Sequence, residues 1–419
     1  MKNTNLITFC MIACLFLLQS CKNDSNKIVI EENYIPELNN KYSSFESKEI
    51  LNKTKDFFQL DFDLSQNLIS IDNGIDSITS LRIQSEKLIS FQTTPFSRIV
   101  ESNDLYFAVP YEINRLLVID KKGEILTTIK ASVPNIESPY QIGFFDVDSK
   151  NKLIYILDEL KAKVFVYSYD GRLMNSFQIP DLVNMYYKLF VIDKNTLVLQ
   201  TKGQPSDEVG SRDSSMVGST LDLKTMKILP MYIQGGGFTR DLLLGKGFFQ
   251  SNTSLYFNYN MSSVLYENYN KKLWAKCQIT SSDFVTEKEI FEFDLVPSSE
   301  NTKIRDNFNK NRKIWLVRGW TIINDIHFIQ LDQGDAPHWL FYNEILNKFK
   351  VMKLNFGKIE SALGKPLPHI IRNVVDNALM VFIDGDALQD NKEFKEKYDP
   401  NSTYLLKIYP KYLNQSAWE

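Results

Sequence analysis

The sequence predicts an all-β protein, a β-propeller built most simply from six blades of four antiparallel strands. The main observation is an internal repeat, because residues 105–129 align without a gap with residues 153–177. Both segments contain a short strand, a polar connection, a second strand, a tight turn and a third strand. A repeat of about this length made of short strands is typical of propeller blades.

Two further observations support this fold class. Aromatic residues make up 13% of the chain, and such residues favour the pleated, half-buried surface of a sheet. No long stretch has the periodicity of an amphipathic helix, and strand patterns do not alternate with helix patterns. The sequence therefore argues against a doubly wound sheet and against an α/β barrel.

The individual strands follow from hydrophobic stretches that lie between turn residues. Gly123 and Gly171 occupy the same place in the repeat, where a hairpin turn needs a residue that tolerates positive φ. The pattern predicts six units, although five or seven are also compatible with it. We expect strands at residues 68–72, 80–83, 105–109, 116–119, 124–129, 144–148, 153–158, 164–167, 172–177, 189–192, 196–200, 219–223, 227–232, 254–259, 264–267, 272–279, 290–295, 314–317, 320–323, 327–331, 339–342, 349–354, 373–375, 379–383 and 404–409.

The N-terminus predicts export and lipid attachment. Lys2 precedes an apolar run of 13 residues, Leu6–Leu18, which is shorter than the ~20 residues that span a bilayer as a helix. This run fits a signal peptide, and the segment 18–21 resembles a bacterial lipobox, whose Cys carries acyl chains such as palmitate. The alternative is an ordinary signal peptide followed by an incidental Cys. We expect a lipoprotein signal peptide at 1–20, a lipidated Cys21 with a flexible tether at 21–54, and the propeller at 55–419.

Cysteine count and charge restrict the remaining function classes. Cys10 and Cys14 lie in the predicted signal peptide and Cys21 would carry lipid, so Cys277 is left without an internal disulfide partner. We expect Cys277 to be a buried apolar residue. The chain has 48 basic and 51 acidic residues, and this near-neutral balance argues against nucleic acid as a partner.

Several segments resemble the six-bladed β-propeller lipoproteins that are common in Bacteroidetes. They are the lipobox ending in Cys21, the strand and turn at 116–123, the segment 153–158, and the Pro-Leu-Pro at 366–368. The resemblance implies the propeller fold and a lipid anchor in the cell envelope, at the outer membrane, on its periplasmic or surface face. One departure is the segment 137–140, which stands where the family often has a Gly-rich stretch.

Motifs for catalysis or metal binding are missing from the sequence. The chain has three His, with no His pair at metal-ligand spacing, no Cys-x-x-Cys pair, no nucleophile elbow and no phosphate-binding loop. The weak ligand-binding candidates are Arg240 in a Gly-rich segment, His338 in a loop that leads into a strand, and Asp384 and Asp386 in an acidic loop. For each of them an ordinary loop or core role is the alternative.

We therefore expect a lipid-anchored, non-catalytic module that binds a ligand, a protein or a glycan, with the membrane as its second partner and no cofactor. Propellers suit this role because loops from every blade converge on one surface. The alternative is a calcium-dependent hydrolase or lyase with Asp, Glu and Asn side chains gathered at the central channel. A structural component of an envelope complex is a third possibility, and it would carry a large exposed apolar patch.

Overall fold

The chain separates into two compact units, Met1–Glu49 and Ile50–Glu419, and the second unit is described here. The predictions for the signal peptide, Cys21 and the tether up to residue 52 lie outside the described residues. The computed structural model describes residues 53–85, 89, 98–110, 114–131, 142–180, 186–205, 214–234, 247–251, 254–258, 263–269, 272–286, 289, 303, 306–334, 336–355, 357–368, 373–375 and 377–419.

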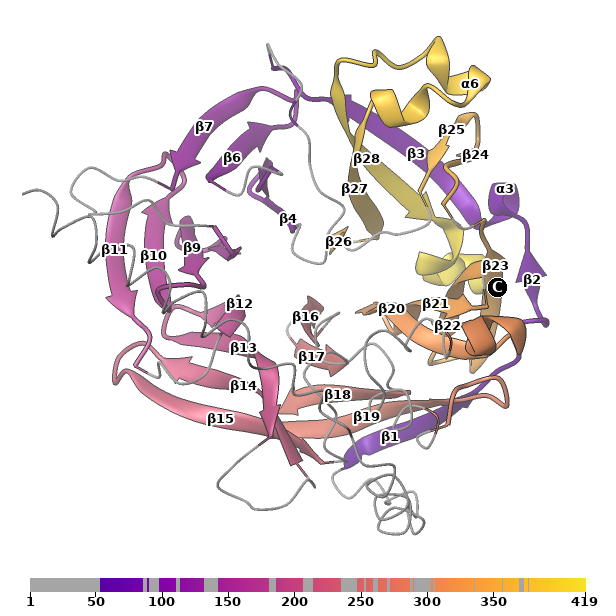
Figure 1. Ribbon diagram of the computed structural model, residues 1–419, viewed down its shortest axis with the longest axis horizontal. Helices are drawn as coiled ribbons and strands as arrows, with labels where there is room; N and C mark the ends of the chain where they lie inside the picture. Colours follow the sequence, from indigo (N-terminus) through magenta and orange to yellow (C-terminus); the bar gives the residue numbers. More distant parts are fainter. Residues whose placement is uncertain are drawn as a thin grey trace, which may run out of the picture. The chain divides into compact units, whose positions relative to one another are not determined.

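Six sheets, each built on an antiparallel meander, follow one another around a common centre (Figure 1). This arrangement confirms the predicted all-β propeller with six blades. The strands of blades 1 to 3 are β4 (Ile99–Ser102), β5 (Leu105–Ala108), β6 (Arg115–Asp120) and β7 (Ile125–Lys130); β8 (Phe144–Asp148), β9 (Leu153–Asp158), β10 (Lys163–Ser168) and β11 (Leu173–Gln178); and β12 (Tyr186–Asp193), β13 (Thr196–Pro205), β14 (Ser214–Asp222) and β15 (Lys227–Gln234).

Blades 4 to 6 complete the ring and take strands from the N-terminal part of the chain. Their strands are β16 (Gly247–Ser251), β17 (Ser254–Asn258), β18 (Val264–Tyr269), β19 (Lys272–Thr280) and β1 (Lys53–Asp61) in blade 4; β20 (Ile314–Ile323), β21 (Ile326–Gln333), β22 (Ala336–Asn343), β23 (Lys348–Lys353) and β2 (Leu68–Ile69) in blade 5; and β26 (Asn373–Val375), β27 (Ala378–Asp384), β28 (Thr403–Pro410) and β3 (Ile75–Arg82) in blade 6.

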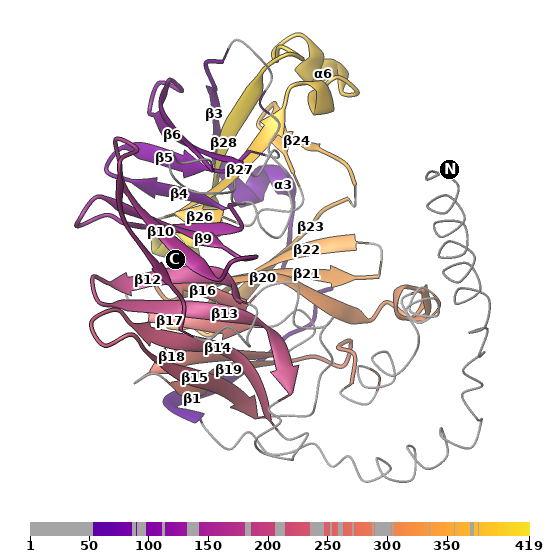
Figure 2. The same cartoon turned by 60° about the vertical axis from the view of Figure 1, so that its left-hand side comes forward.

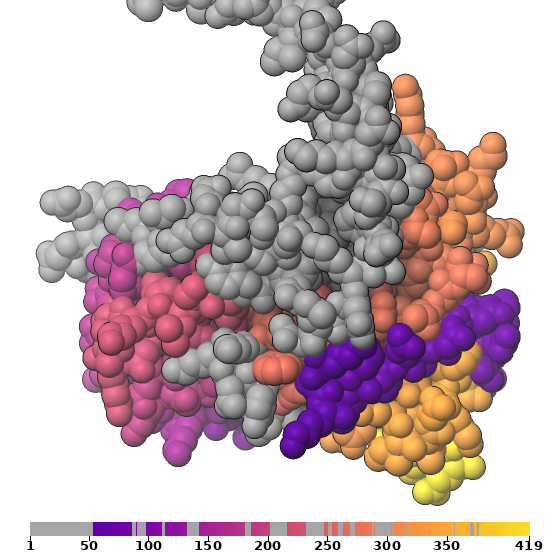
Figure 3. Space-filling model, turned by 90° about the horizontal axis from the view of Figure 1, so that it is seen from below, coloured from indigo at the N-terminus to yellow at the C-terminus, as the bar shows by residue number. Residues whose placement is uncertain are grey.

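The N-terminal segment from β1 to β3 runs along the outside of three blades. β1 pairs parallel to β19, β2 pairs parallel to β23, and β3 pairs antiparallel to β28. Figure 3 shows this segment in indigo, lying against the orange part of the chain. A short helix, α3 (Ile71–Gly74), connects β2 to β3, and the Ser70 side chain caps its first turn.

Pairing of β3 with β28 closes the ring, because β3 leads along the chain into blade 1 while β28 belongs to blade 6. Figure 2 shows the strands of blade 1 beside β27 and β28. The N–H of Ile99 in β4 donates to Oδ1 of Asn373 in β26 at 3.0 Å. Lys407 in β28 pairs with Glu101 in β4 at 2.7 Å. The first and last blades are thus joined both at the centre and at mid-blade.

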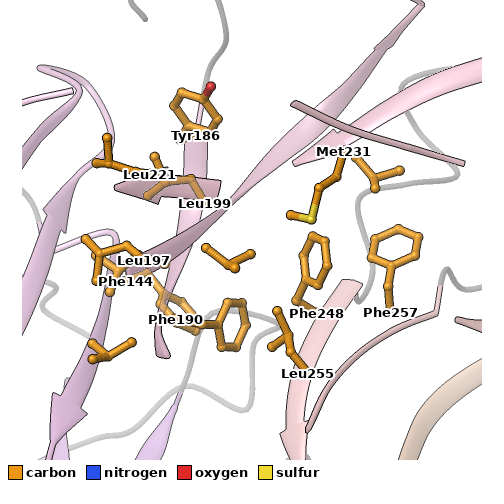
Figure 4. Packing of buried hydrophobic residues seen from close by; sticks show 14 of the residues in the cluster. Phe144, Tyr186, Phe190, Leu197, Leu199, Leu221, Met231, Phe248, Leu255 and Phe257 are labelled. Atoms are coloured by element: carbon orange, nitrogen blue, oxygen red, sulfur yellow. The ribbon is translucent and has the colours of Figure 1, made fainter. Parts of the chain in front are cut away.

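Hydrophobic side chains fill the spaces between neighbouring blades. One cluster joins blades 2, 3 and 4 through Phe144, Phe190, Phe248 and Phe257, which lie in a row (Figure 4). The second and third strands of a blade have neighbours on both faces, which is why β9 and β10 are buried almost continuously. Their near-continuous apolar sequences follow from this two-sided burial.

The remaining short elements lie in the link between blades 5 and 6, in the link between β27 and β28, and at the C-terminus. Trp418 is buried, and its indole N–H donates to the Tyr412 carbonyl. No helix of the described ranges is long and apolar enough to cross a membrane. The short elements outside the blade strands are the hairpin β24 (Glu360–Ala362) and β25 (Lys365–Leu367), the helices η2 (Asp386–Leu388) and α6 (Lys392–Lys395), and the C-terminal turns η3 (Lys411–Leu413) and η4 (Gln415–Trp418).

Several strand predictions need correction or stay open. The predicted strand at 68–72 is the two-residue β2 followed by the start of α3, and β1, β4, β24 and β25 were not predicted. β1 begins at Lys53, so the last two residues of the predicted tether belong to the sheet of blade 4. The predicted strands at 314–317 and 320–323 are one strand, β20, whose two register shifts against β21 interrupt the alternation. Blade 4 begins with β16, which the sequence prediction missed because a Gly-rich segment precedes a run of only five residues. The predicted strand at 290–295 lies outside the described residues.

Candidate functional site

The six strands β4, β8, β12, β16, β20 and β26 are the first strands of their blades and lie nearest the centre of the ring (Figure 1). Neighbouring first strands are in contact: β4 contacts β8 on one side and β26 on the other. In this fold, polar side chains on these strands and on the loops at their ends are the ones that can meet a ligand at the axis.

The two faces of the ring differ in the length of their connections. Every blade is an antiparallel meander, so its first strand begins on the side where its second strand ends and its third begins. We call this side the connection face, and the opposite side the turn face. Turns on the turn face are tight, as at Asn103–Asp104 and Asn324–Asp325, where both residues have positive φ. The connection face carries the longer links, such as the one from Asp384 to Thr403.

Topology places three of the four predicted ligand-binding residues on the connection face. His338 lies near the start of the third strand of blade 5, and Asp384 ends the second strand of blade 6. Asp386 begins η2 in the link that follows. Arg240 belongs to the link between blades 3 and 4 and lies outside the described residues.

His338 is buried in the core of blade 5. Its side chain is 4% exposed, and its Nδ1 lies 3.0 Å from the Ala336 carbonyl oxygen. Burial lowers the pKa of His338 to about 4, and the nearby charge of Lys353 acts in the same direction. His338 is therefore neutral at pH 7, with Nδ1 donating to the backbone.

The carboxylates of the acidic loop in blade 6 differ in their partners and in their exposure. Oδ1 of Asp384 accepts from the Thr403 hydroxyl at 3.2 Å, whereas Asp386 is exposed. Asp399, later in the same loop, accepts from Ser402 and pairs with Arg82. Within the described ranges, no three His, Cys, Asp or Glu side chains lie close enough to hold a metal ion.

The structure reveals a buried ion pair at the first strands that the sequence prediction missed. Arg98, directly before β4, contacts Oδ1 of Asp146 in β8 at 2.8 Å, and their side chains are 18% and 4% exposed. The guanidinium carbon lies 5.2 Å from the Phe144 ring centre and 5.1 Å from that of Phe190. The cation is thus held by a carboxylate and by two aromatic rings.

Asp146 links the first strands of three consecutive blades. Its Oδ1 accepts from its own neighbour Val147, and its Oδ2 accepts from the N–H of Val191 in β12, each at 2.8 Å. Burial raises the pKa of Asp146, while the Arg98 charge and these two N–H donors act to lower it. The buried carboxylate therefore depends on Arg98 for charge compensation.

A second buried pair lies in blade 5. Nε and Nη2 of Arg318 in β20 contact Oδ2 of Asp332 in β21 at 2.7 and 2.6 Å. The Arg318 side chain is 21% exposed and that of Asp332 is 4% exposed. Blades 1 and 5 thus each bring a guanidinium, anchored by a buried carboxylate, to the strands that surround the axis.

A chain of polar contacts also joins blades 4 and 5 away from these pairs. The indole N–H of Trp320 donates to Nδ1 of His327 at 3.0 Å, and Nε2 of His327 lies 3.1 Å from Glu344. Glu344 pairs in turn with Lys276, which contacts Asp56 of β1. Since Nδ1 accepts, Nε2 carries the proton, and burial lowers the pKa of His327. This network holds β1 onto the ring.

The sequence contains a signal for the ion pairs Arg98–Asp146 and Arg318–Asp332. Arg98 and Arg318 each stand as a lone cation in an apolar run, and Asp146 interrupts the run Phe144–Val147 in the same way. A charge within a buried strand requires a partner. The partners lie 48 and 14 positions away in the chain, so the sequence could not pair them.

Comparison with known proteins agrees with this architecture. The model of the DUF5128 family, described as a 6-bladed beta-propeller, matches residues 89–365. The chain belongs to this family. No curated protein matches it.

Solved structures resemble this DUF5128 propeller at low identity. A candidate exported protein from Bacteroides fragilis superposes with a TM-score of 0.62 at 13% identity, covering 85% of this chain and 99% of its own. A member of the DUF4221 family from Bacteroides vulgatus gives a TM-score of 0.54 at 11% identity, covering 81% and 99%. These likenesses concern the fold.

Removing Arg98 from the DUF5128 propeller should destabilise it strongly. We expect Arg98→Met to lower the free energy of unfolding by about 3 kcal/mol, because it leaves Asp146 buried without its cation. Arg98→Met combined with Asp146→Asn should recover part of this loss. The matched control is Arg172→Met, which breaks an exposed pair with Asp170 and should cost less than about 0.5 kcal/mol. Urea denaturation measures all of them, and equal losses for Arg98→Met and Arg172→Met would contradict the assignment.

Acid should weaken the propeller partly through His338. Its folded pKa of about 4 lies below the ordinary value of 6.5, so the unfolded chain takes up the proton first. This stabilising contribution is complete above pH 6.5 and is lost as the pH falls toward 4, with an upper bound of roughly 3 kcal/mol. We expect His338→Asn to show a smaller decline over this interval in pH-dependent denaturation. His327 titrates in both proteins, so parallel curves would show that His338 does not contribute.

Proposed function

We propose that this DUF5128 protein is a lipid-anchored propeller of the cell envelope that binds a ligand, glycan or partner protein on its connection face, without catalysis. The contrast between the two faces carries this proposal. Tight turns form the turn face, whereas the described strand ends show that the longer links begin and end on the connection face. Variable links on a rigid frame are where propellers and other scaffolds place their binding residues.

The arrangement of charged groups supports binding more than hydrolysis. Of the carboxylates on the described first strands, Asp146 is engaged by Arg98 and Glu101 by Lys121 and Lys407. Asp332, on the neighbouring strand β21, is engaged by Arg318. The calcium-dependent hydrolase would need several carboxylate oxygens converging on one point, and the described residues hold no such group. A calcium titration followed by thermal melting tests this alternative, since a specific site raises Tm in a saturable way.

Two observations support the location. The segment 18–21 at the end of the apolar run is a lipobox-like sequence, and the similar protein of Bacteroides fragilis is described as a candidate exported protein. Both support a location outside the cytoplasm, and the lipobox-like sequence supports attachment to a membrane through acyl chains on Cys21.

Site-specific photo-crosslinking in the source bacterium tests the binding face. A photoreactive residue at Asp386, exposed on the connection face, should give a discrete adduct with the ligand or partner. The matched control is Lys194, which is exposed in a tight turn on the turn face. Adducts of the same kind and yield from both positions, or from Lys194 alone, would contradict the proposal.

The anchor is tested separately. In cells fed an alkyne-labelled palmitate, the wild-type chain should carry label and sediment with membranes, because acyl chains partition into the bilayer. Cys21→Ser should lose the label and leave the membrane fraction, while Cys277→Ser should retain both. Labelling of the Cys21→Ser variant would show that the lipobox reading is wrong.

A further inference from the structure

The outer edges of the six blades differ in how well they are protected against pairing with another strand. Exposed edges are usually blunted by charge, by proline or by brevity. Four of the described outer edge strands carry a charge, and β15 also carries Pro230, while β2 has two residues. The charged edge strands are β1, β3, β7 and β15. β11, with the sequence LMNSFQ, has neither charge nor proline.

Apolar side chains are exposed at both ends of β11. Leu173 and Met174, at its start, are 38% and 60% exposed. Leu160 is 75% exposed and lies near the other end, because the Gln178 amide donates to the carbonyl oxygen of Lys161, which follows Leu160 in the turn. β11 itself is thus uncharged and carries large exposed apolar side chains, and the nearest charge, Arg172, precedes it in the turn and pairs with Asp170. β11 lies on the rim of the ring (Figure 1).

The backbone of β11 offers hydrogen bonds at its outer side. The N–H of Ser176 donates to Oδ1 of Asn175 at 2.8 Å, so it points away from β10. Alternation along a strand gives Gln178 the same outward orientation. The bond to Asn175 is a local side-chain substitute that a carbonyl of another strand can replace.

The same molecule shows that this position accepts an added strand. β11 is the fourth strand of blade 2, and the fourth strands of blades 4 and 5, β19 and β23, each pair with an N-terminal strand on their outer side. Pairing at the edge of β11 would continue an arrangement that the propeller already uses twice.

We propose that β11 pairs with β11 of a second copy of this chain, in antiparallel orientation about a twofold axis at Ser176. In this register Met174 lies opposite Gln178 of the second copy. The apolar start of each β11 then meets the Leu160 end of the other, so the same patch serves both copies. A strand without charge also places no like charges opposite one another.

Cysteine cross-linking of the full chain in detergent tests this pairing. Residues opposite one another in a hydrogen-bonded pair have Cα atoms about 5.5 Å apart, which suits a disulfide. We expect Ser176→Cys to give a dimer band on a non-reducing gel after mild oxidation, and the band to disappear on reduction. The matched control is Thr128→Cys, which has the same place in the repeat on the charged edge strand β7, together with the wild-type chain.

The outcomes separate a second copy from other occupants. Met174→Lys in the Ser176→Cys background should abolish the dimer band, and light scattering should give the mass of two copies for the wild-type chain and of one copy for Met174→Lys. The proposal is overturned if Ser176→Cys melts like the wild type but gives no dimer, or if Thr128→Cys cross-links equally. An adduct of Ser176→Cys with a different protein, or a one-copy mass for the wild-type chain, also overturns it.

Discussion

Closure of the ring is the constraint on which the rest of the structure depends. Each blade buries apolar residues on both faces against its neighbours, so blades 1 and 6 would expose one face each if the ring were open. Pairing of β3 with β28 prevents this, and the contacts of Glu101 with Lys407 and of Ile99 with Asn373 add links at the same seam. Before it reaches β3, the N-terminal segment also adds a strand to blade 4 through β1 and to blade 5 through β2.

The buried ion pair of Arg98 and Asp146 also helps to hold the ring together. Asp146 accepts from β12 and pairs with Arg98 beside β4, so one buried carboxylate fixes the spacing of three first strands. A buried pair of this kind gives specific geometry, whereas loss of one partner leaves an uncompensated charge. Arg98 and Arg318 are nevertheless partly exposed. Arg98 lies just before β4 and Arg318 in the first half of β20, so both are nearer the connection face than the turn face.

The proposed binding face and the proposed pairing of copies use different parts of the molecule. β11 lies on the rim, and antiparallel pairing there directs the connection faces of the two copies to opposite sides. Both faces would then stay open to ligands or partners. The network from Trp320 through His327 to Lys276 lies between blades 4 and 5, away from this edge, and keeps β1 in place in either state.

The sequence by itself determined the fold class, because each blade is a local unit: short apolar strands, tight turns at Gly123 and Gly171, and a repeat that carries them forward. It also indicated that Cys277 is buried, which the structure confirms. Only the tertiary structure showed which distant residues and strands pair with one another. Arg98 and Asp146 come from different blades, β1 to β3 join strands more than 200 positions away, and His338 proved to be a buried core residue. Strand formation depends on neighbours in sequence, whereas closure, charge pairing and the character of each face depend on contacts between distant strands.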